Sequence, residues 1–200
     1  MKPIFIKNFL PEQILNLCRS YLYIKLNNKT TFTVDPSTDS LVVDYADYLM
    51  ETIMDMSTPV IEQNVGKKLW PTYSFLRVYG KGSDLKPHTD RDSCEYTVAL
   101  CLGSDPEDKP YDIFLGEQDS SSDYKHIDVD TKKLTAYKIE NKYAMKLNDA
   151  LIFQGQDKEH WRETCTHDHF ITVFLHYVDQ ERDLADYKFD KRKFLGQPEK

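Results

Sequence analysis

The sequence is poor in the features that mark membrane and nucleic-acid-binding proteins. It contains no apolar stretch of membrane-spanning length, and residues 1–10 hold no basic leader followed by an apolar core. We therefore expect a cytoplasmic protein that does not enter a membrane. Positive charge is scarce, because 26 Lys and Arg face 33 Asp and Glu and leave a formal net charge of −7. A protein that binds a phosphate backbone over a large surface needs an excess of positive charge, so nucleic acid is a disfavoured partner.

Cysteine is also scarce, and its spacing argues against two kinds of site. Cys18, Cys94, Cys101 and Cys165 form no C-x-x-C pair. This argues against a zinc knuckle and against a thioredoxin-like redox motif. Reduced, buried thiols are the simpler interpretation.

The composition that remains is that of one folded domain. Apolar residues make up 40% of the 200 positions, and 30% charged residues keep the surface solvated. A chain of this length buries a core without a disulfide or a structural metal. We predict a single domain over residues 1–200, with an N-terminal strand and supporting helices (1–71), a β-rich core (72–178) and a charged C-terminal segment (179–200).

The first third of the chain predicts one short strand and two helices. Residues 3–9 alternate weakly in polarity, as a strand does. A helix is predicted over residues 11–28, because its proline suits a first helical turn and apolar residues recur at helical spacing. A second helix is predicted after the turn-forming cluster 36–40, with the apolar residues of 42–56 on one face and Pro59 as its limit or kink.

From Thr72 onward the chain changes to short runs rich in aromatic and β-branched residues, which are typical of strands. Turn-rich stretches at 103–110 and 118–123 separate them, and this spacing favours a sandwich or jelly roll over alternating βαβ units. We therefore predict a mainly β protein whose charged end, 179–193, is loosely packed or a short helix. The predicted strand runs are 73–79, 96–102, 112–115, 143–147, 150–153 and 170–178.

A His-x-Asp motif and a distant histidine carry the first sign of chemistry. Two imidazoles and one carboxylate on one side of an Fe(II) ion leave three exchangeable positions on the other. His88 and Asp90 are two residues apart, so at a strand end they point the same way. His160 would complete the set from a strand paired across the barrel.

The motif alone is weak evidence. With six His and 22 Asp, about 0.7 His-x-Asp triplets are expected by chance. A second one exists at residues 126–128, His-Ile-Asp, in a polar stretch without a glycine-containing lead-in, and we interpret it as a surface loop. His167, His169 and His176 are predicted to be surface or strand-packed residues rather than ligands.

The residues around the first motif supply the missing context. A Tyr-Gly-x-Gly turn at 79–82, Pro-His-Thr-Asp at 87–90 and an apolar run follow one another in the chain. Asn-Asp-Ala-Leu-Ile-Phe at 148–153 precedes the distal histidine, and Phe-Leu-Pro-Glu at 9–12 opens the first helix. In this order the segments resemble the prolyl 4-hydroxylase-like branch of the Fe(II)/2-oxoglutarate oxygenases, over residues 4–178. The Asn stands where that branch has Gly, and both residues can enter positive φ.

The resemblance implies a fold and a chemistry. The fold is a double-stranded β-helix, or jelly roll, with N-terminal helices packed on one sheet. Fe(II) would be held by His88, Asp90 and His160, with 2-oxoglutarate and O2 as cosubstrates, succinate and CO2 as coproducts, and ascorbate as a stimulating reductant. The substrate would be a prolyl or other amino-acid side chain in a peptide, or a small metabolite.

The residue that anchors the 5-carboxylate of 2-oxoglutarate is less clear from the sequence. Tyr79 supplies a hydroxyl in the resemblance, but the cation expected about ten residues after the distal histidine is replaced by His and Phe at 169–170. Arg162 is our first candidate, because it shares the side of the distal histidine on an extended chain. Arg77 is the second, and a protonated His169 is the third. For each arginine a salt bridge is the alternative role.

Two other functions stay open. One is a jelly-roll protein that binds a metal or small anion without turnover, which the missing family cation favours. The other is a zinc hydrolase with Glu159 or Glu163 as general base. If the protein is an oxygenase, residues 91–95, with Arg91, Asp92 and Glu95, and the segment 103–126 are expected to face the substrate. The sequence identifies neither the substrate nor the oligomeric state.

Overall fold

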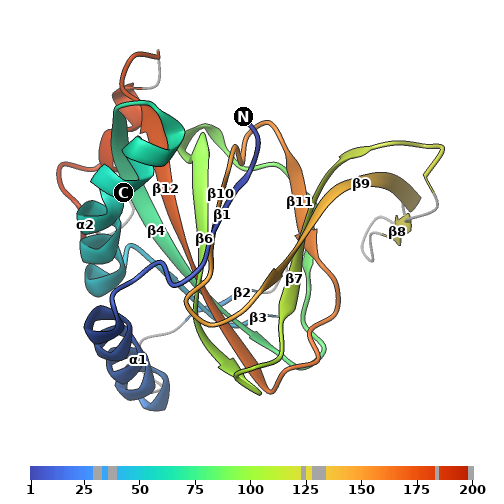
Figure 1. Cartoon of the computed structure of the whole chain (residues 1–200), viewed down its shortest axis with the longest axis horizontal. Helices are drawn as coiled ribbons and strands as arrows, with labels where there is room; N and C mark the ends of the chain where they lie inside the picture. The colour runs from blue at the N-terminus through green and yellow to red at the C-terminus, as the bar shows by residue number, and fades with distance from the viewer. Residues whose placement is uncertain (29–32, 36–39, 123–124, 128–133, 183–184, 198–200) are drawn as a thin grey trace.

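Two antiparallel sheets face one another and form a jelly roll, as predicted (Figure 1). The computed structural model describes residues 1–28, 33–35, 40–122, 125–127, 134–182 and 185–197. In spatial order the larger sheet holds β1 (Ile4–Ile6), β10 (Ala150–Phe153), β6 (Tyr96–Asp105), β12 (His169–Asp179), β4 (Leu69–Gly80), β3 (Ser40–Tyr45) and β2 (Thr33–Asp35). The smaller sheet holds β5 (Leu85–His88), β11 (Glu159–Arg162), β7 (Tyr111–Gln118), β9 (Leu134–Met145) and β8 (Lys125–Ile127).

Two helices, α1 (Glu12–Asn27) and α2 (Tyr48–Val65), cover the outer face of the larger sheet (Figure 1). The alternation of side chains along each strand divides the core in two. On β6, Val98, Leu100 and Leu102 pack toward the helices, whereas Ala99 and Cys101 point between the two sheets. The space between the sheets is therefore the place where a buried site can form.

The second helix begins later than the sequence predicts. Residues 40–45 form strand β3, whose Val43 pairs with Arg77 of β4. The helix starts only after Asp47, whose side chain accepts a hydrogen bond from the Met50 amide at 3.0 Å and so caps the first turn. An apolar run rich in Val suits a strand as well as a helix face, and the available edge of β4 decides between them. The helix then continues through Pro59.

Short connections complete the described chain. The turn before β10 contains Asn148 at φ 63°, as the substitution of Asn for Gly predicts, and its side chain bonds both backbone groups of Leu10. A 3-10 turn, η1 (Asp92–Cys94), follows the first His-x-Asp motif. The charged C-terminal segment contains a second one, η2 (Ala185–Lys191). No helix in the described ranges is long and apolar enough to cross a membrane.

Candidate metal site and neighbouring anion pocket

Three predicted ligands meet between the sheets. β5 and β11 pair so that His160 lies opposite His88, and Asp90 follows two residues after the end of β5. The Oδ1 atom of Asp90 lies 3.6 Å from Nε2 of His88 and 3.5 Å from Nε2 of His160. All three donor atoms lie within 4.8 Å of one another, which is close enough for one metal ion to bind all of them.

Backbone contacts orient both imidazoles for this purpose. Nδ1 of His88 lies 2.7 Å from the carbonyl oxygen of Lys86, and Nδ1 of His160 lies 3.0 Å from that of Lys158. A carbonyl oxygen only accepts hydrogen bonds, so in each ring Nδ1 carries the proton. Nε2 is then the nitrogen that faces the other ligands, and it is the atom that would bind a metal after losing its proton.

The Asp90 carboxylate is held from three sides. Its backbone amide donates to the carbonyl oxygen of Gly155 at 2.8 Å, and its Oδ2 accepts from the Thr97 hydroxyl at 2.8 Å. Burial by itself would raise the pKa of Asp90, but the contacts with His160 and His88 hold that pKa well below its usual value. The carboxylate is therefore ionised and directs Oδ1 at the two histidines.

A cavity of about 160 Å³ opens beside these ligands. Aromatic rings form much of its wall, and Asp90 is the single carboxylate among the described residues that line it. Neither Glu159 nor Glu163, the alternative general bases of a zinc hydrolase, is part of this lining. The other lining residues are Tyr73, Phe75, Arg77, Leu85, Phe174 and His176.

A second group of polar atoms lies deeper between the sheets. Arg162 is 1% exposed, and its Nη1 donates to the carbonyl oxygens of Tyr111 at 2.8 Å and Asp112 at 3.2 Å. Its Nε and Nη2 atoms, and the hydroxyl of Tyr79, are buried and have no hydrogen-bond partner among the described residues. The guanidinium carbon lies 5.6 Å from the centre of the Tyr79 ring. The sequence did not single out Thr172, whose buried hydroxyl also lacks a partner in the described part of the chain.

Unsatisfied buried donors are costly, at about 1–3 kcal/mol each and more for a charged group. A guanidinium with two free N–H groups beside a tyrosine hydroxyl is suited to a carboxylate, which a planar arginine binds through both oxygens. The donor set therefore fits an acidic ligand that enters between the sheets.

The other two anchor candidates lie elsewhere. Arg77 lines the cavity beside the metal ligands, with its guanidinium 5.4 Å from the centre of the Phe75 ring. His169 lies in a separate hollow of about 360 Å³ with Leu22 and Ile171, on the side of the sheet that faces the helices. His169 thus faces the helices, whereas the ligands of the smaller sheet lie in the space between the two sheets.

Sequence reasoning missed two residues next to the ligands. His176 was predicted to be strand-packed, and it is, but its Nδ1 also lies 3.1 Å from the hydroxyl of Thr97. Tyr73 lies tilted against the His176 ring, with 4.5 Å between centroids. Strand parity on β12 could have placed His176 with Phe174 between the sheets. Of the second His-x-Asp motif, Asp128 lies outside the described residues.

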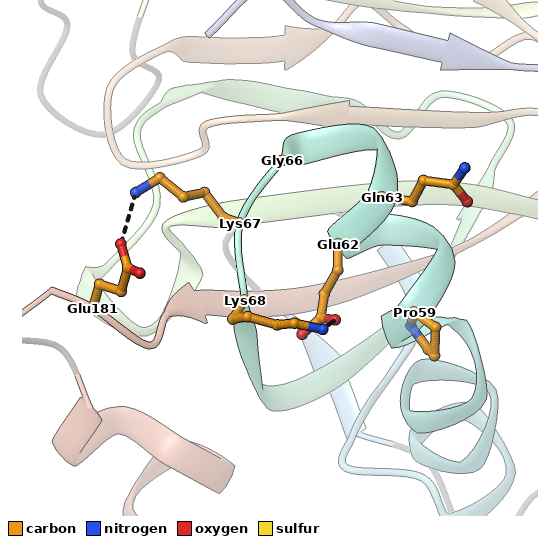
Figure 2. Close-up of a pocket in the computed structure, with 7 residues that line it drawn as sticks. All are labelled: Pro59, Glu62, Gln63, Gly66, Lys67, Lys68 and Glu181. Atoms are coloured by element: carbon orange, nitrogen blue, oxygen red, sulfur yellow. Dashed lines mark hydrogen bonds and ion pairs between the residues drawn. The ribbon is translucent and has the colours of Figure 1, made fainter.

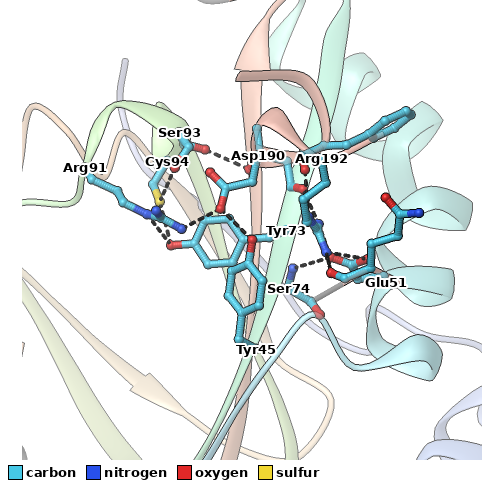
Figure 3. Close-up of polar contacts among 12 residues, drawn as sticks. Tyr45, Glu51, Tyr73, Ser74, Arg91, Ser93, Cys94, Asp190 and Arg192 are labelled. Atoms are coloured by element: carbon cyan, nitrogen blue, oxygen red, sulfur yellow. Dashed lines mark hydrogen bonds and ion pairs between the residues drawn. The ribbon is translucent and has the colours of Figure 1, made fainter. Parts of the chain in front are cut away.

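The loop after the motif is tied to the C-terminal segment, residues 185–197 (Figure 3). Arg91 binds Asp190 at 2.7 Å and lies over the ring of Tyr73, and Arg192 binds Glu51 of α2 at 2.6 Å. This part of the charged C-terminal segment is therefore packed firmly and supports one wall of the cavity.

The residues of 91–95 that were expected to face the substrate do not all lie beside the cavity. Glu95 is 1% exposed and accepts from the Asp179 amide at 2.8 Å and from Arg182, so it supports the end of β12 rather than facing the cavity. Asp92 accepts from Tyr187 of the C-terminal segment at 3.0 Å. Arg91 and Cys94 both contact Tyr73 of the cavity wall: Arg91 lies over its ring, and Sγ of Cys94 lies 3.1 Å from its hydroxyl.

A larger hollow of about 490 Å³ lies at the end of α2, far from these ligands in the chain (Figure 2). Its charged residues are already paired, Lys68 with Glu62 at 2.6 Å and Lys67 with Glu181 at 3.4 Å. Figure 2 shows these side chains lying along the surface rather than converging on a point. The hollow therefore offers no set of free polar groups for a ligand.

Comparison with known proteins identifies the fold. No protein-family model and no curated protein matches the sequence. Solved structures do match, and we describe three. The non-heme α-ketoglutarate-dependent epimerase SnoN of nogalamycin biosynthesis has a TM-score of 0.62 at 9% identity, covering 88% of this chain and 77% of its own. A prolyl-4-hydroxylase of Pseudomonas putida has a TM-score of 0.55 at 12% identity, covering 87% of this chain and 91% of its own.

HygX of Streptomyces hygroscopicus, solved with nickel and 2-oxoglutarate, has a TM-score of 0.56 at 13% identity, covering 90% of this chain and 83% of its own. At such identities the likeness establishes the fold alone. The chain thus has the jelly-roll fold of these three proteins, among which are an epimerase and a hydroxylase.

Proposed function

We propose that the protein is an Fe(II)- and 2-oxoglutarate-dependent oxygenase. The observation that carries this proposal is the presence of two donor sets between the same pair of sheets. The donor atoms of His88, Asp90 and His160 lie within 4.8 Å of one another. Arg162 and Tyr79 carry buried donors that have no partner among the described residues. A metal site alone, or an anion site alone, is also expected in a protein that binds its ligand without catalysing a reaction.

The metal set suits iron. Two neutral imidazoles and one carboxylate are the ligands that non-haem Fe(II) oxygenases use, and they leave room for exchangeable ligands. Fe(II) at this position would supply, with 2-oxoglutarate and O2, an oxidative decarboxylation to succinate and CO2 coupled to oxidation of the substrate. The chain's own residues hold Asp90 ionised and both histidines in the ligating tautomer.

The anion set suits 2-oxoglutarate. The 5-carboxylate would be bound by Nε and Nη2 of Arg162, with the hydroxyls of Tyr79 and Thr172 as further donors. Arg162 reaches this position from β11, two residues after His160, and so replaces the cation that the related branch places about ten residues after its distal histidine. The free-energy cost of burying the ligand's carboxylate is offset by its pairing with the arginine and by the hydrogen bonds that it supplies to donors otherwise left unsatisfied.

The substrate is proposed to be an amino-acid side chain, prolyl or other, in a peptide, or a small metabolite. The cavity beside the ligands is small, about 160 Å³, and is walled by the aromatic rings of Tyr73, Phe75 and Phe174. A compact group that leaves water behind fits such a wall better than a strongly hydrated one. Hydroxylation is the reaction we propose, at a carbon presented through this cavity.

Two measurements test the proposal. Under anaerobic conditions, Fe(II) and 2-oxoglutarate together should give a visible charge-transfer absorption that Zn(II) cannot give. With O2 and ascorbate, the protein should convert 2-oxoglutarate to succinate and CO2, and faster in the presence of substrate extracts. Binding of metal without any 2-oxoglutarate consumption, even with extracts, would instead support a non-catalytic metal- or anion-binding protein.

A further inference from the structure

A hydrogen-bonded chain leads from the Asp90 carboxylate into the larger sheet. The hydroxyl oxygen of Thr97 lies 2.8 Å from Oδ2 of Asp90 and 3.1 Å from Nδ1 of His176. Thr97 on β6 and His176 on β12 are direct partners in the strand pairing. Thr97 is fully buried and His176 is 4% exposed, so neither contact competes with bulk water.

The chemistry of the groups determines the direction of each hydrogen bond. An ionised carboxylate only accepts, so the single hydroxyl proton of Thr97 is donated to Asp90. The contact between Thr97 and His176 then needs a proton on Nδ1 of the ring. Burial lowers the pKa of His176 to about 4, so this is the neutral ring with Nε2 unprotonated.

The surrounding residues hold this chain in one arrangement. The Tyr73 ring lies tilted against the His176 ring at 4.5 Å between centroids, and the Phe174 ring is stacked on it at 6.4 Å. Behind the carboxylate lies Gly155, where a Cβ atom would be 2.1 Å from Oδ2 of Asp90 and 2.6 Å from the Thr97 hydroxyl. The carboxylate therefore has little freedom to rotate, and Oδ1 is the oxygen left for the two histidines.

We propose that Thr97 and His176 are positioning residues that hold Asp90 with Oδ2 engaged and Oδ1 presented to the metal. The proposal rests on the metal site of the proposed function. Both residues would act on the metal through Asp90. Partners of this kind are worth about 10–100-fold in metal affinity when they are removed.

Titration of the full-length protein with Co(II) alone tests the proposal without any turnover. Thr97→Val keeps the shape and loses the hydroxyl, and His176→Phe keeps the ring and loses the donor. Each should weaken Co(II) binding about 10–100-fold and change the visible Co(II) absorption, because the freed carboxylate can turn. Thr97→Ser and His176→Asn retain a donor at the same place and should bind within about threefold of the wild type.

A matched control separates positioning from general loss of stability. Thr58 donates its hydroxyl to the carbonyl oxygen of Met54 at 3.0 Å within α2, on the outer face of the larger sheet. Thr58→Val should lower the unfolding temperature but leave the Co(II) affinity and absorption unchanged. Equal weakening in Thr58→Val and Thr97→Val would overturn the proposal. If Thr97→Val does not fold, His176→Phe decides.

Asp90→Ala separates a failure of the metal site from a failure of the positioning role. If it binds Co(II) as the wild type does, or if the wild type binds none, the metal site and the positioning role both fail. If Asp90→Ala loses binding while Thr97→Val and His176→Phe keep wild-type affinity and absorption, the metal site stands and only the positioning role fails.

Discussion

His88 and His160 lie opposite one another in the β5–β11 pair, with their ring centroids 4.3 Å apart. This register is what gathers the proposed ligands, because a slip of one residue would turn one ring to the other face of the sheet. The strand pairing and the metal set are therefore one structural feature, and the ligands are held together before any metal binds.

Replacement of His88 by Ala should abolish the charge-transfer absorption of Fe(II) and 2-oxoglutarate. The variant loses an Nε2 lone pair that the Lys86 carbonyl orients toward the site. The measurement is an anaerobic absorption titration, with His169→Ala as the matched control because His169 faces the helix side of the sheet. An unchanged absorption in His88→Ala would contradict the ligand assignment.

Replacement of Arg162 by Met should raise the KM for 2-oxoglutarate by about 100-fold or more, because hydrogen bonds to a charged group contribute about 1.5–3 kcal/mol each. Arg162→Lys should restore only part of this, since an ammonium cannot bind a carboxylate through two parallel N–H groups. The measurement is succinate formation at varied 2-oxoglutarate. Arg77→Met is the informative comparison, and a larger KM increase in that variant would move the anchor to Arg77.

Much of this architecture could be predicted from local sequence. The jelly roll, the first helix and the positive φ of Asn148 follow from residue patterns within short stretches. The sequence also named His88, Asp90 and His160, which the fold brings together. Their roles, and that of Arg162, stay predictions until they are tested by mutation.

The parts that could not be predicted depend on contacts between distant segments. β5 and β11 read Leu-Lys-Pro-His and Glu-His-Trp-Arg, which carry too few β-branched residues to indicate strands. They are strands because they pair with each other, and β11 pairs with β7 on its other side. Likewise, Thr97 meets His176 only because β6 and β12 pair in one register, which no local pattern reveals.

The four cysteines should resist modification in the native protein. All are free and buried, and burial raises the pKa of Cys18 to about 11 and of Cys94 and Cys101 to about 12, while that of Cys165 is also raised. Each therefore stays a neutral thiol at pH 8, and the thiol is far less reactive than the thiolate. A disulfide-exchange reagent at pH 8 should count no rapidly reacting thiols before denaturation and four after it. Rapid reaction of the native protein would contradict the burial.

Loss of the Glu51–Arg192 ion pair should destabilise the fold. Both side chains are at most 2% exposed, and Glu51→Gln would leave Arg192 as a buried charge without its carboxylate, at a cost of about 3–5 kcal/mol. Chemical denaturation measures the free energy of unfolding. Glu107→Gln is the control, because its pair with Arg19 is exposed and should contribute little. Similar stabilities for the two variants would show that the C-terminal contact is not structural.

Replacement of Gly155 by Ala should impair metal binding more than folding. The added methyl would lie 2.1 Å from Oδ2 of Asp90, so the carboxylate must move away from the Thr97 hydroxyl and from the two histidines. Gly103→Ala is the matched control, because its new methyl meets the end of the flexible Ile171 side chain at 3.0 Å and that chain can turn aside.

Co(II) affinity and the unfolding temperature should be measured for both. We expect Gly155→Ala to lose about 10-fold or more in affinity, as for loss of a partner that orients a ligand, with Gly103→Ala unchanged. Wild-type affinity in Gly155→Ala would mean that the carboxylate can bind from a second position, and the close approach of the backbone to Asp90 would then have no role in the site.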